Sequence, residues 1–224
     1  MSGIEDFERR IINQGMTEED FVEYKKLLNR VQSNYSKRQH CYTTAIQFPQ
    51  EYAEQAIKLI KYGLENFDDG WFTTYTSHLY IGHIYESIAN YQKAFDHFLL
   101  AKSALGADHP DYEKELSLDL LWMKLHIDSF RYSEELKGYY ACYEKTDGFS
   151  KSLVNNEFKM VVAKIVIALH NQNIEEARNL LKTAKEMCKS KRMGKLYDLL
   201  HRHNYQESFK TTPEAVNFIK KIQI

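Results

Sequence analysis

The chain has 224 residues, with 30 Lys and Arg against 31 Asp and Glu, so its formal net charge is −1. Such a balance gives no overall field that would draw the protein onto nucleic acid or an anionic membrane. Only 3 Pro and 9 Gly are present, too few for the many turns of an all-β fold and typical of helices with short connections. We therefore expect an all-α protein.

Cysteine usage and the apolar segments bear on the compartment. Cys41, Cys142 and Cys188 lie far apart and form no CxxC pair, which argues against a disulfide framework and against a zinc site. We expect core thiols in a reducing, cytoplasmic setting. The N-terminal MSGIEDFERR is charged where a signal peptide needs an apolar core, and MVVAKIVIAL is short and interrupted by Lys164. We expect no membrane insertion.

The first third of the chain predicts helices. Residues 1–16 are polar and suit either a short helix or a frayed end. Thr17 and Asp20 form a capping-box pattern ahead of apolar residues at helical spacing, which predicts a helix over 17–34.

A second helix is predicted within 50–67, after Pro49, because proline disfavours the α region at the residue before it. Gly63 lies on the apolar side of this helix. A neighbouring helix can approach closely there.

The stretch from Tyr75 to Ala101 is the most regular part of the sequence. It predicts a helix over about 74–89 and a second helix capped by Asn90. Small residues on the facing sides, Gly82 and Ala94, would let the two helices pack tightly. A side chain of leucine size at either position should therefore overpack the hairpin.

These residues resemble the tetratricopeptide repeat (TPR) family. Counted over the 34 positions of that repeat from Tyr75, its defining small and aromatic positions are occupied by Gly82, Tyr85, Ala89, Ala94, Phe98 and Ala101. Fainter copies align at Ala56, Glu135 and Ala177. The usual fourth-position Trp is His78.

The resemblance implies a superhelical array of about four antiparallel helical hairpins, a TPR-like α-solenoid, over residues 37–187. We expect one all-α domain over 1–224, with the helix 17–34 before the array. A basic segment and a C-terminal capping helix would follow over 188–224. For the capping helix, Thr212 is the expected N-cap, and Val216, Ile219 and Ile222 form the apolar stripe.

The resemblance also implies where a partner would bind. In the family, set positions on the first helix of each hairpin line the concave face. The corresponding candidate binding residues are Thr76, Leu79, His83, Glu86, Ser87, Lys124, Asp128, Lys159, Val166 and His170. Lys164 falls on a normally buried position, which indicates that the last copy could be aligned out of register.

Motifs for chemistry are missing from the sequence: it has no phosphate-binding glycine loop, nucleophile elbow, HExxH or calcium loop. His83 and Glu86, three residues apart on a helix, could share a metal ion, but two ligands fall short of a site, and a solvated or peptide-facing pair is the preferred interpretation. The basic segment 185–202 has only Tyr197 as an aromatic platform, so a solvated face is preferred over a nucleic-acid contact.

We therefore expect a non-enzymatic protein-interaction module without a cofactor. It would hold a protein or peptide as an adaptor or as a stoichiometric inhibitor, for example a toxin-immunity protein. The alternatives are a nucleic-acid-associated helical repeat that uses 185–202, and a metal-dependent enzyme at His83 and Glu86. Salt dependence of binding would distinguish the first alternative, and metal analysis the second.

Overall fold

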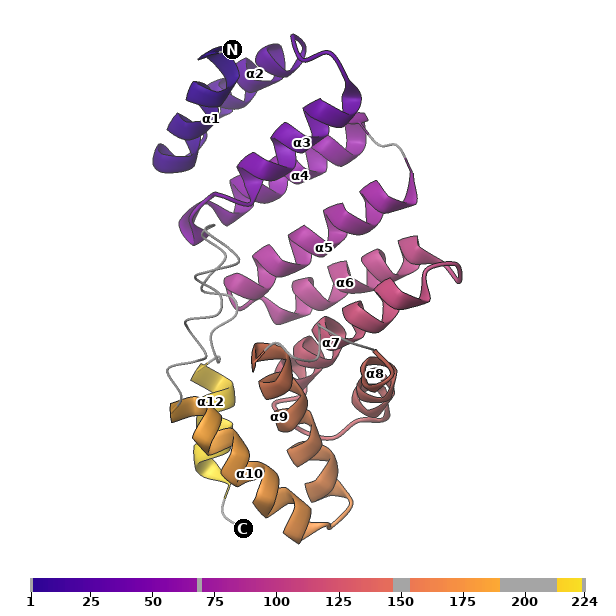
Figure 1. Ribbon diagram of the computed structural model, residues 1–224. Coiled ribbons are helices and arrows are strands. Elements are labelled where there is room, and N and C mark those ends of the chain that lie inside the picture. The colour runs from indigo at the N-terminus through magenta and orange to yellow at the C-terminus, as the bar shows by residue number, and fades with distance from the viewer. Residues whose placement is uncertain (1, 68–69, 147–153, 190–212, 223–224) are drawn as a thin grey trace. The chain divides into compact units, whose positions relative to one another are not determined.

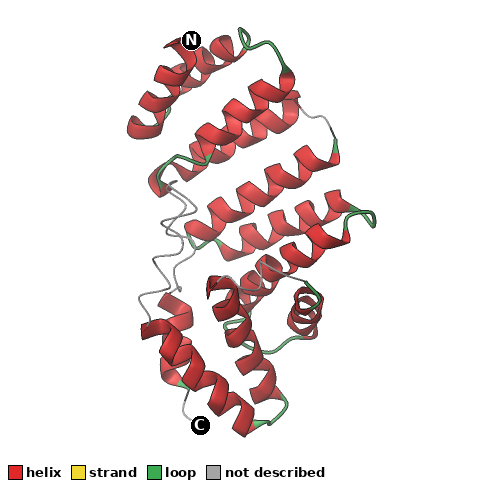
Figure 2. Ribbon diagram, in the orientation of Figure 1, coloured by secondary structure: helices red, strands yellow, loops and turns green. Residues whose placement is uncertain are grey.

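The computed structural model describes residues 2–67, 70–146, 154–189 and 213–222 (Figure 1). This part of the chain consists of helices and loops, without a strand (Figure 2). The all-α prediction is confirmed. No helix in these residues combines the length and the apolar character needed to cross a bilayer.

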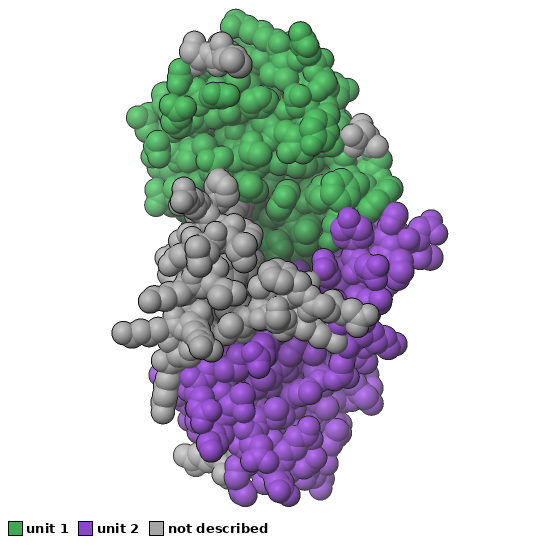
Figure 3. Space-filling view, viewed as in Figure 1, with its two compact units in different colours: residues 1–104, 203–205 green, residues 105–202, 206–224 purple. Residues whose placement is uncertain are grey.

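The chain forms two compact units (Figure 3). Unit 1 holds the described residues up to Ala104 and unit 2 those from Leu105 on. A single domain over 1–224 stays a prediction. The first unit carries α1 (Ser2–Gln14), α2 (Glu18–Leu28), α3 (Asn34–Ala45), a 3-10 turn (Gln50–Tyr52), α4 (Ala53–Phe67), α5 (Trp71–Ser87) and α6, which runs over Tyr91–Leu105. The second carries α7 (Pro110–Ile127), α8 (Glu134–Glu144), α9 (Val154–His170), α10 (Ile174–Lys189) and α12 (Pro213–Lys221).

The capping box at the start of α2 is present as predicted. The Asp20 backbone N–H donates to Thr17 Oγ1 at 3.1 Å, and the Thr17 N–H donates to the Asp20 carboxylate at 3.0 Å. The predicted helix over 17–34 is wrong at its far end, because α2 stops at Leu28. Ser33 then caps a new helix, α3, by accepting the Ser36 N–H at 3.0 Å. The serine side chain thus satisfies a backbone donor at the start of α3.

Helices α3 and α4 lie side by side (Figure 1). They approach closely at Gly63. A Cβ added at Gly63 would lie 3.1 Å from Tyr42 Cε1 and 3.2 Å from the Cβ of Cys41. The predicted close approach at this glycine is confirmed.

The hairpin of α5 and α6 is packed as the sequence predicts. A Cβ at Gly82 would collide with the Phe98 ring, 2.7 Å from its Cδ1. Ala94, Phe98 and Ala101 are fully buried. Asn90 caps α6, since its side-chain oxygen accepts the Lys93 N–H at 3.4 Å. The first helix is shifted from the predicted 74–89, because it begins at Trp71 and ends at Ser87.

Three hairpins share one kind of turn. At the end of the first helix, a backbone N–H reaches the carbonyl five residues earlier: Asn90 to Tyr85, Phe130 to Leu125 and Asn173 to Ala168, at 2.9, 2.7 and 2.9 Å. The residue before each donor, Ala89, Ser129 or Gln172, has a positive φ. This is the Schellman arrangement, which reverses the chain within a few residues. The same local device therefore recurs along the chain without glycine.

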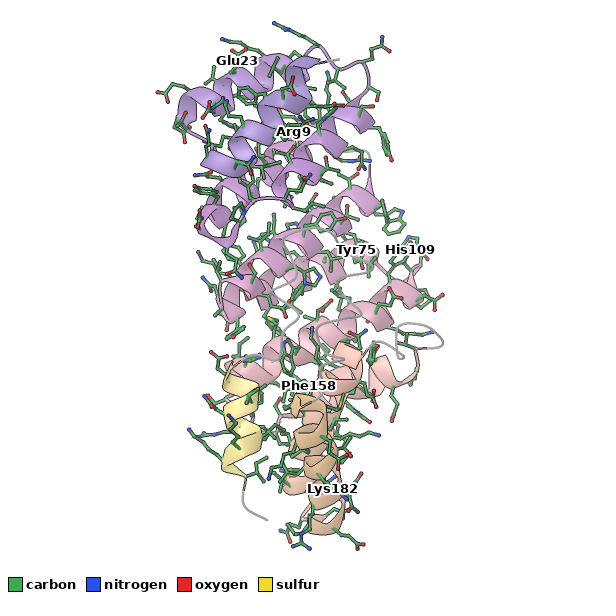
Figure 4. All side chains as sticks on the ribbon, turned by 60° about the vertical axis from the view of Figure 1, so that its left-hand side comes forward. Arg9, Glu23, Tyr75, His109, Phe158 and Lys182 are labelled. Carbon is green, nitrogen blue, oxygen red and sulfur yellow. The ribbon has the colours of Figure 1, made fainter. Side chains whose placement is uncertain are left out.

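The core of unit 2 is built around Trp122 of α7 and Phe158 of α9, whose rings meet edge to face at 6.3 Å. Figure 4 labels Phe158 on α9. Helix α12 packs against α10, and its Phe218 ring stacks on Phe130 at 4.8 Å. Ile219 is buried as predicted, but its buried companion is Ala215, whereas Val216 is half-buried.

The predicted N-cap Thr212 and residues 190–202 of the predicted basic segment lie outside the described residues.

The prediction of core thiols holds for one cysteine and fails for another. Cys41 is a core thiol, and burial raises its pKa to about 12. The same expectation is wrong for Cys188, which is exposed near the end of α10.

Candidate functional site

The predicted partner surface of unit 1 is one side of α5. Thr76, Leu79, His83 and Ser87 are all half-buried, which matches residues on the rim between a helix core and solvent. The Thr76 hydroxyl donates to the Phe72 carbonyl at 2.7 Å, and the Ser87 hydroxyl donates to the Ile84 carbonyl at 2.8 Å. Both hydroxyls are thus bonded to their own helix, and Leu79 is the apolar side chain of this side.

Glu86 belongs to the same predicted set, but its side chain is only 2 % exposed. One carboxylate oxygen lies 3.1 Å from His83 Nδ1, and the His83 ring meets the Phe98 ring at 5.1 Å. Glu86 is thus buried in unit 1, and its direct contact with a partner stays a prediction. Glu86 holds the imidazole of His83, whose side chain is 18 % exposed, in place.

In unit 2, Lys124 and Asp128 of the predicted set form an ion-pair cluster with α8. The Lys124 Nζ lies 2.8 Å from Glu135 Oε2 and 3.4 Å from Asp128 Oδ1. The hydrogen bond to Glu135 raises the pKa of Lys124, helped by the charge of Asp128. Both predicted residues retain some exposure, and their charges already compensate one another.

Lys159 and Val166, from the predicted set on α9, are buried. The Lys159 Nζ lies 3.6 Å from Asp119 Oδ1 of α7 and 5.6 Å from the centre of the Trp122 ring. The two side chains therefore belong to the packing of α9 in unit 2, and their role as partner contacts stays a prediction. Lys164, expected on the buried side, has an exposed fraction of 42 % for its side chain.

His170 is exposed at the end of α9 and stacks on the Tyr132 ring, with centroids 3.6 Å apart and planes inclined by 4°. Tyr132 lies in the turn between α7 and α8. The stacked pair joins the turn ends of two consecutive hairpins and remains accessible.

A histidine pair between α5 and α6 did not emerge from the sequence. The Nδ1 atoms of His78 and His97 are 3.0 Å apart, so one ring donates a hydrogen bond and the other accepts it. Burial, followed by the charges of His78 and Lys61, lowers the pKa of His97 to about 4. Burial also lowers the pKa of His78. The available signal was His78 itself, at the repeat position that normally holds Trp.

Within the described ranges, no group of three or more His, Cys, Asp or Glu side chains comes together in a way that could hold a metal ion. His83 and Glu86 are a two-residue pair. Of the basic segment 185–202, only residues 185–189 at the end of α10 are described. The metal-enzyme and nucleic-acid alternatives remain hypotheses.

Comparison of the chain with models of known protein families, with curated proteins and with solved structures found no match. A functional proposal therefore depends on the contacts and the exposure of the residues described in each unit.

Proposed function

We propose that this chain is a non-enzymatic protein-interaction module, a TPR-like helical array that holds a protein or peptide partner on the exposed side of its hairpins. In this proposal it works in the cytoplasm, as an adaptor or as a stoichiometric inhibitor such as a toxin-immunity protein. Occupation of the partner, and not a reaction, is the activity.

The observation that carries the proposal is the half-exposed side of α5. Leu79 and His83 present an apolar and a polar side chain from a helix that is held against α6 by the close contact of Gly82 with Phe98. A rigid helix with a mixed, half-exposed side is well suited to contact a partner without first losing much side-chain entropy. The recurring turn of the three hairpins supports a repeated presentation of this kind.

The test is affinity capture from the native host with the wild-type chain, Leu79→Arg and Val22→Arg. Val22 is an exposed apolar residue of α2 in the same unit, so it controls for adding a cation to unit 1. We expect a protein that is retained by the wild-type chain and by Val22→Arg, and lost with Leu79→Arg. Ser87→Arg, on the same side of α5, should lose the same protein.

A captured protein that is insensitive to both Leu79→Arg and Ser87→Arg would contradict binding on this side of α5. Thermal unfolding of each variant must show that α5 is intact, since an arginine at a half-buried leucine can cost stability.

A further inference from the structure

A hollow of about 310 Å³ lies in unit 2 between α8, α9 and α10. Its walls are the rings of Tyr140 and Tyr143 and the aliphatic side chains of Met160, Val161 and Leu180. The volume is at the lower end of the range for ligand sites. It is large enough for one or two side chains of another molecule.

The rim of the hollow carries charge. Glu144, Asn156, Glu157 and Lys164 complete its lining. The Tyr140 hydroxyl donates to Glu144 Oε1 at 3.0 Å. Burial raises the pKa of Tyr140, and the nearby charges of Glu144 and Glu176 add to the effect. The hollow and its surroundings therefore carry three negative charges, from Glu144, Glu157 and Glu176, and one positive charge, from Lys164.

Lys164 shows what kind of group the hollow favours. Its Nζ lies 5.8 Å from the centre of the Tyr140 ring and 4.0 Å from Glu144 Oε1. Both contacts are long, and the Lys164 and Glu144 side chains are 42 % and 58 % exposed. An ammonium held this loosely contributes little stability and can swing into solvent. The hollow therefore has an aromatic ring and a carboxylate arranged around a weakly held cation.

This site differs from the surface predicted on α9. Glu157 and Lys164, seven residues apart, share one side of that helix and face the hollow. Lys159 and Val166 share another side, about 160° round the helix at 100° per residue, and are buried. The hollow is thus independent of the partner surface assigned from the repeat pattern.

We propose that the hollow receives an arginine side chain, with a neighbouring aliphatic residue, from a basic segment of the partner protein. The inference rests on the proposed function in so far as the occupant belongs to a protein. A guanidinium is planar, stacks on a tyrosine ring and bonds a carboxylate through two N–H groups. It would displace Lys164 from Tyr140 and pair with Glu144 and Glu157, while the aliphatic residue would contact Met160, Val161 and Leu180.

The test is a methyl NMR titration of the full chain with the blocked tripeptide acetyl-Leu-Arg-Leu-amide. We expect saturable shifts of the Met160 and Val161 methyl signals. The peptide with citrulline, the neutral isostere of arginine, should bind about tenfold more weakly, because it loses the charge-assisted bonds. Glu144→Gln and Glu157→Gln should each weaken binding several-fold, roughly as loss of one such bond requires.

Two further variants sharpen the test. Glu134→Gln removes a carboxylate from the exposed start of α8, away from the hollow, and should leave the affinity unchanged. Lys164→Met removes the competing cation and should tighten binding. Weaker binding by Lys164→Met would overturn the proposed displacement.

Equal affinity for the arginine and citrulline peptides would overturn the proposal, as would the absence of saturable shifts at Met160. These failures are distinct from failure of the proposed function. A partner lost with Leu79→Arg, yet retained by a Glu144→Gln, Glu157→Gln double variant, would leave protein binding in place and remove only the arginine site.

Discussion

Gly82 shows how one missing side chain determines the packing of a hairpin. The Phe98 ring occupies the space that a Cβ at this position would need, and Phe98 is itself fully buried. An interior this dense cannot yield without shifting a helix or straining a rotamer. The close contact predicted from the repeat pattern is therefore present in atomic detail.

Gly82→Ala should destabilise the protein by about 1–3 kcal/mol, measured as the free energy of unfolding in urea, and Gly82→Leu by more. Gly138→Ala is the matched control, because a Cβ at Gly138 meets nothing within 4 Å. That substitution should stabilise α8 by roughly 0.5–1 kcal/mol through its helix propensity. An equal effect of both alanines would contradict the packing explanation.

The pair of His78 and His97 makes stability depend on pH. The pKa of His97 is lowered from 6.5 to about 4 in the folded protein. Between these two pH values, His97 is protonated in the unfolded chain and neutral in the folded chain. The contribution of His97 to the free energy of unfolding is fully present above pH 6.5 and is lost as the pH falls from 6.5 through about 4. Lys61 of α4 and Lys93 of α6 reinforce it, while Asp96 opposes it.

The urea midpoint of the wild-type chain should fall between pH 7 and pH 5, and His97→Gln should reduce that fall. His170→Gln, which replaces an exposed histidine of α9, serves as the control. It should leave the fall in the urea midpoint between pH 7 and pH 5 unchanged. An identical pH profile for wild type and His97→Gln would exclude this pair as the source.

At the scale of elements, α1 is attached through a buried polar network. The Tyr24 hydroxyl of α2 donates to Glu8 Oε1 of α1 at 2.8 Å, and His40 Nδ1 of α3 lies 2.9 Å from the same oxygen. Tyr24 is fully buried. Loss of the shared acceptor would leave a buried hydroxyl with only its long contact to Thr44, at 3.4 Å.

Glu8→Ala should cost about 1–3 kcal/mol and speed hydrogen exchange of the α1 amides, because the buried Tyr24 hydroxyl loses its acceptor. Glu8→Gln keeps an acceptor oxygen and should have a smaller effect. Glu5→Ala, at an exposed position of the same helix, controls for helix propensity. Equal exchange rates in Glu8→Ala and Glu5→Ala would show that the network does not hold α1.

At the scale of the whole molecule, salt separates protein binding from the nucleic-acid alternative. For a partner on the mixed side of α5, a rise from 50 to 200 mM salt should change Kd by less than about threefold, because few exposed charges take part. Contact with 6–10 phosphates would instead cost roughly 10³–10⁵ in affinity. A steep salt dependence of the captured partner would favour the basic segment 185–202.

The sequence alone determined the features that depend on near neighbours along the chain. The all-α class, the capping box of Thr17 and the close contacts at Gly63 and Gly82 follow from composition, local hydrogen bonding and side-chain size. The sequence also indicated hairpins, since the aromatic and small residues of 75–101 recur at defined positions. The end of α2 at Leu28 was missed, because the apolar spacing continues to Val31 and the N-cap role of Ser33 for α3 depends on its backbone conformation.

Only the tertiary structure decided which side of α9 is buried. The run MVVAKIVIAL is apolar almost all round, so its periodicity does not single out one side. The contacts of Phe158 with Trp122 and of Lys159 with Asp119 of α7 decide which side of α9 is buried. As a result, Lys164 lies on the side that faces the hollow with Tyr140. Such contacts join residues far apart in sequence, and neither propensity nor repeat position encodes them.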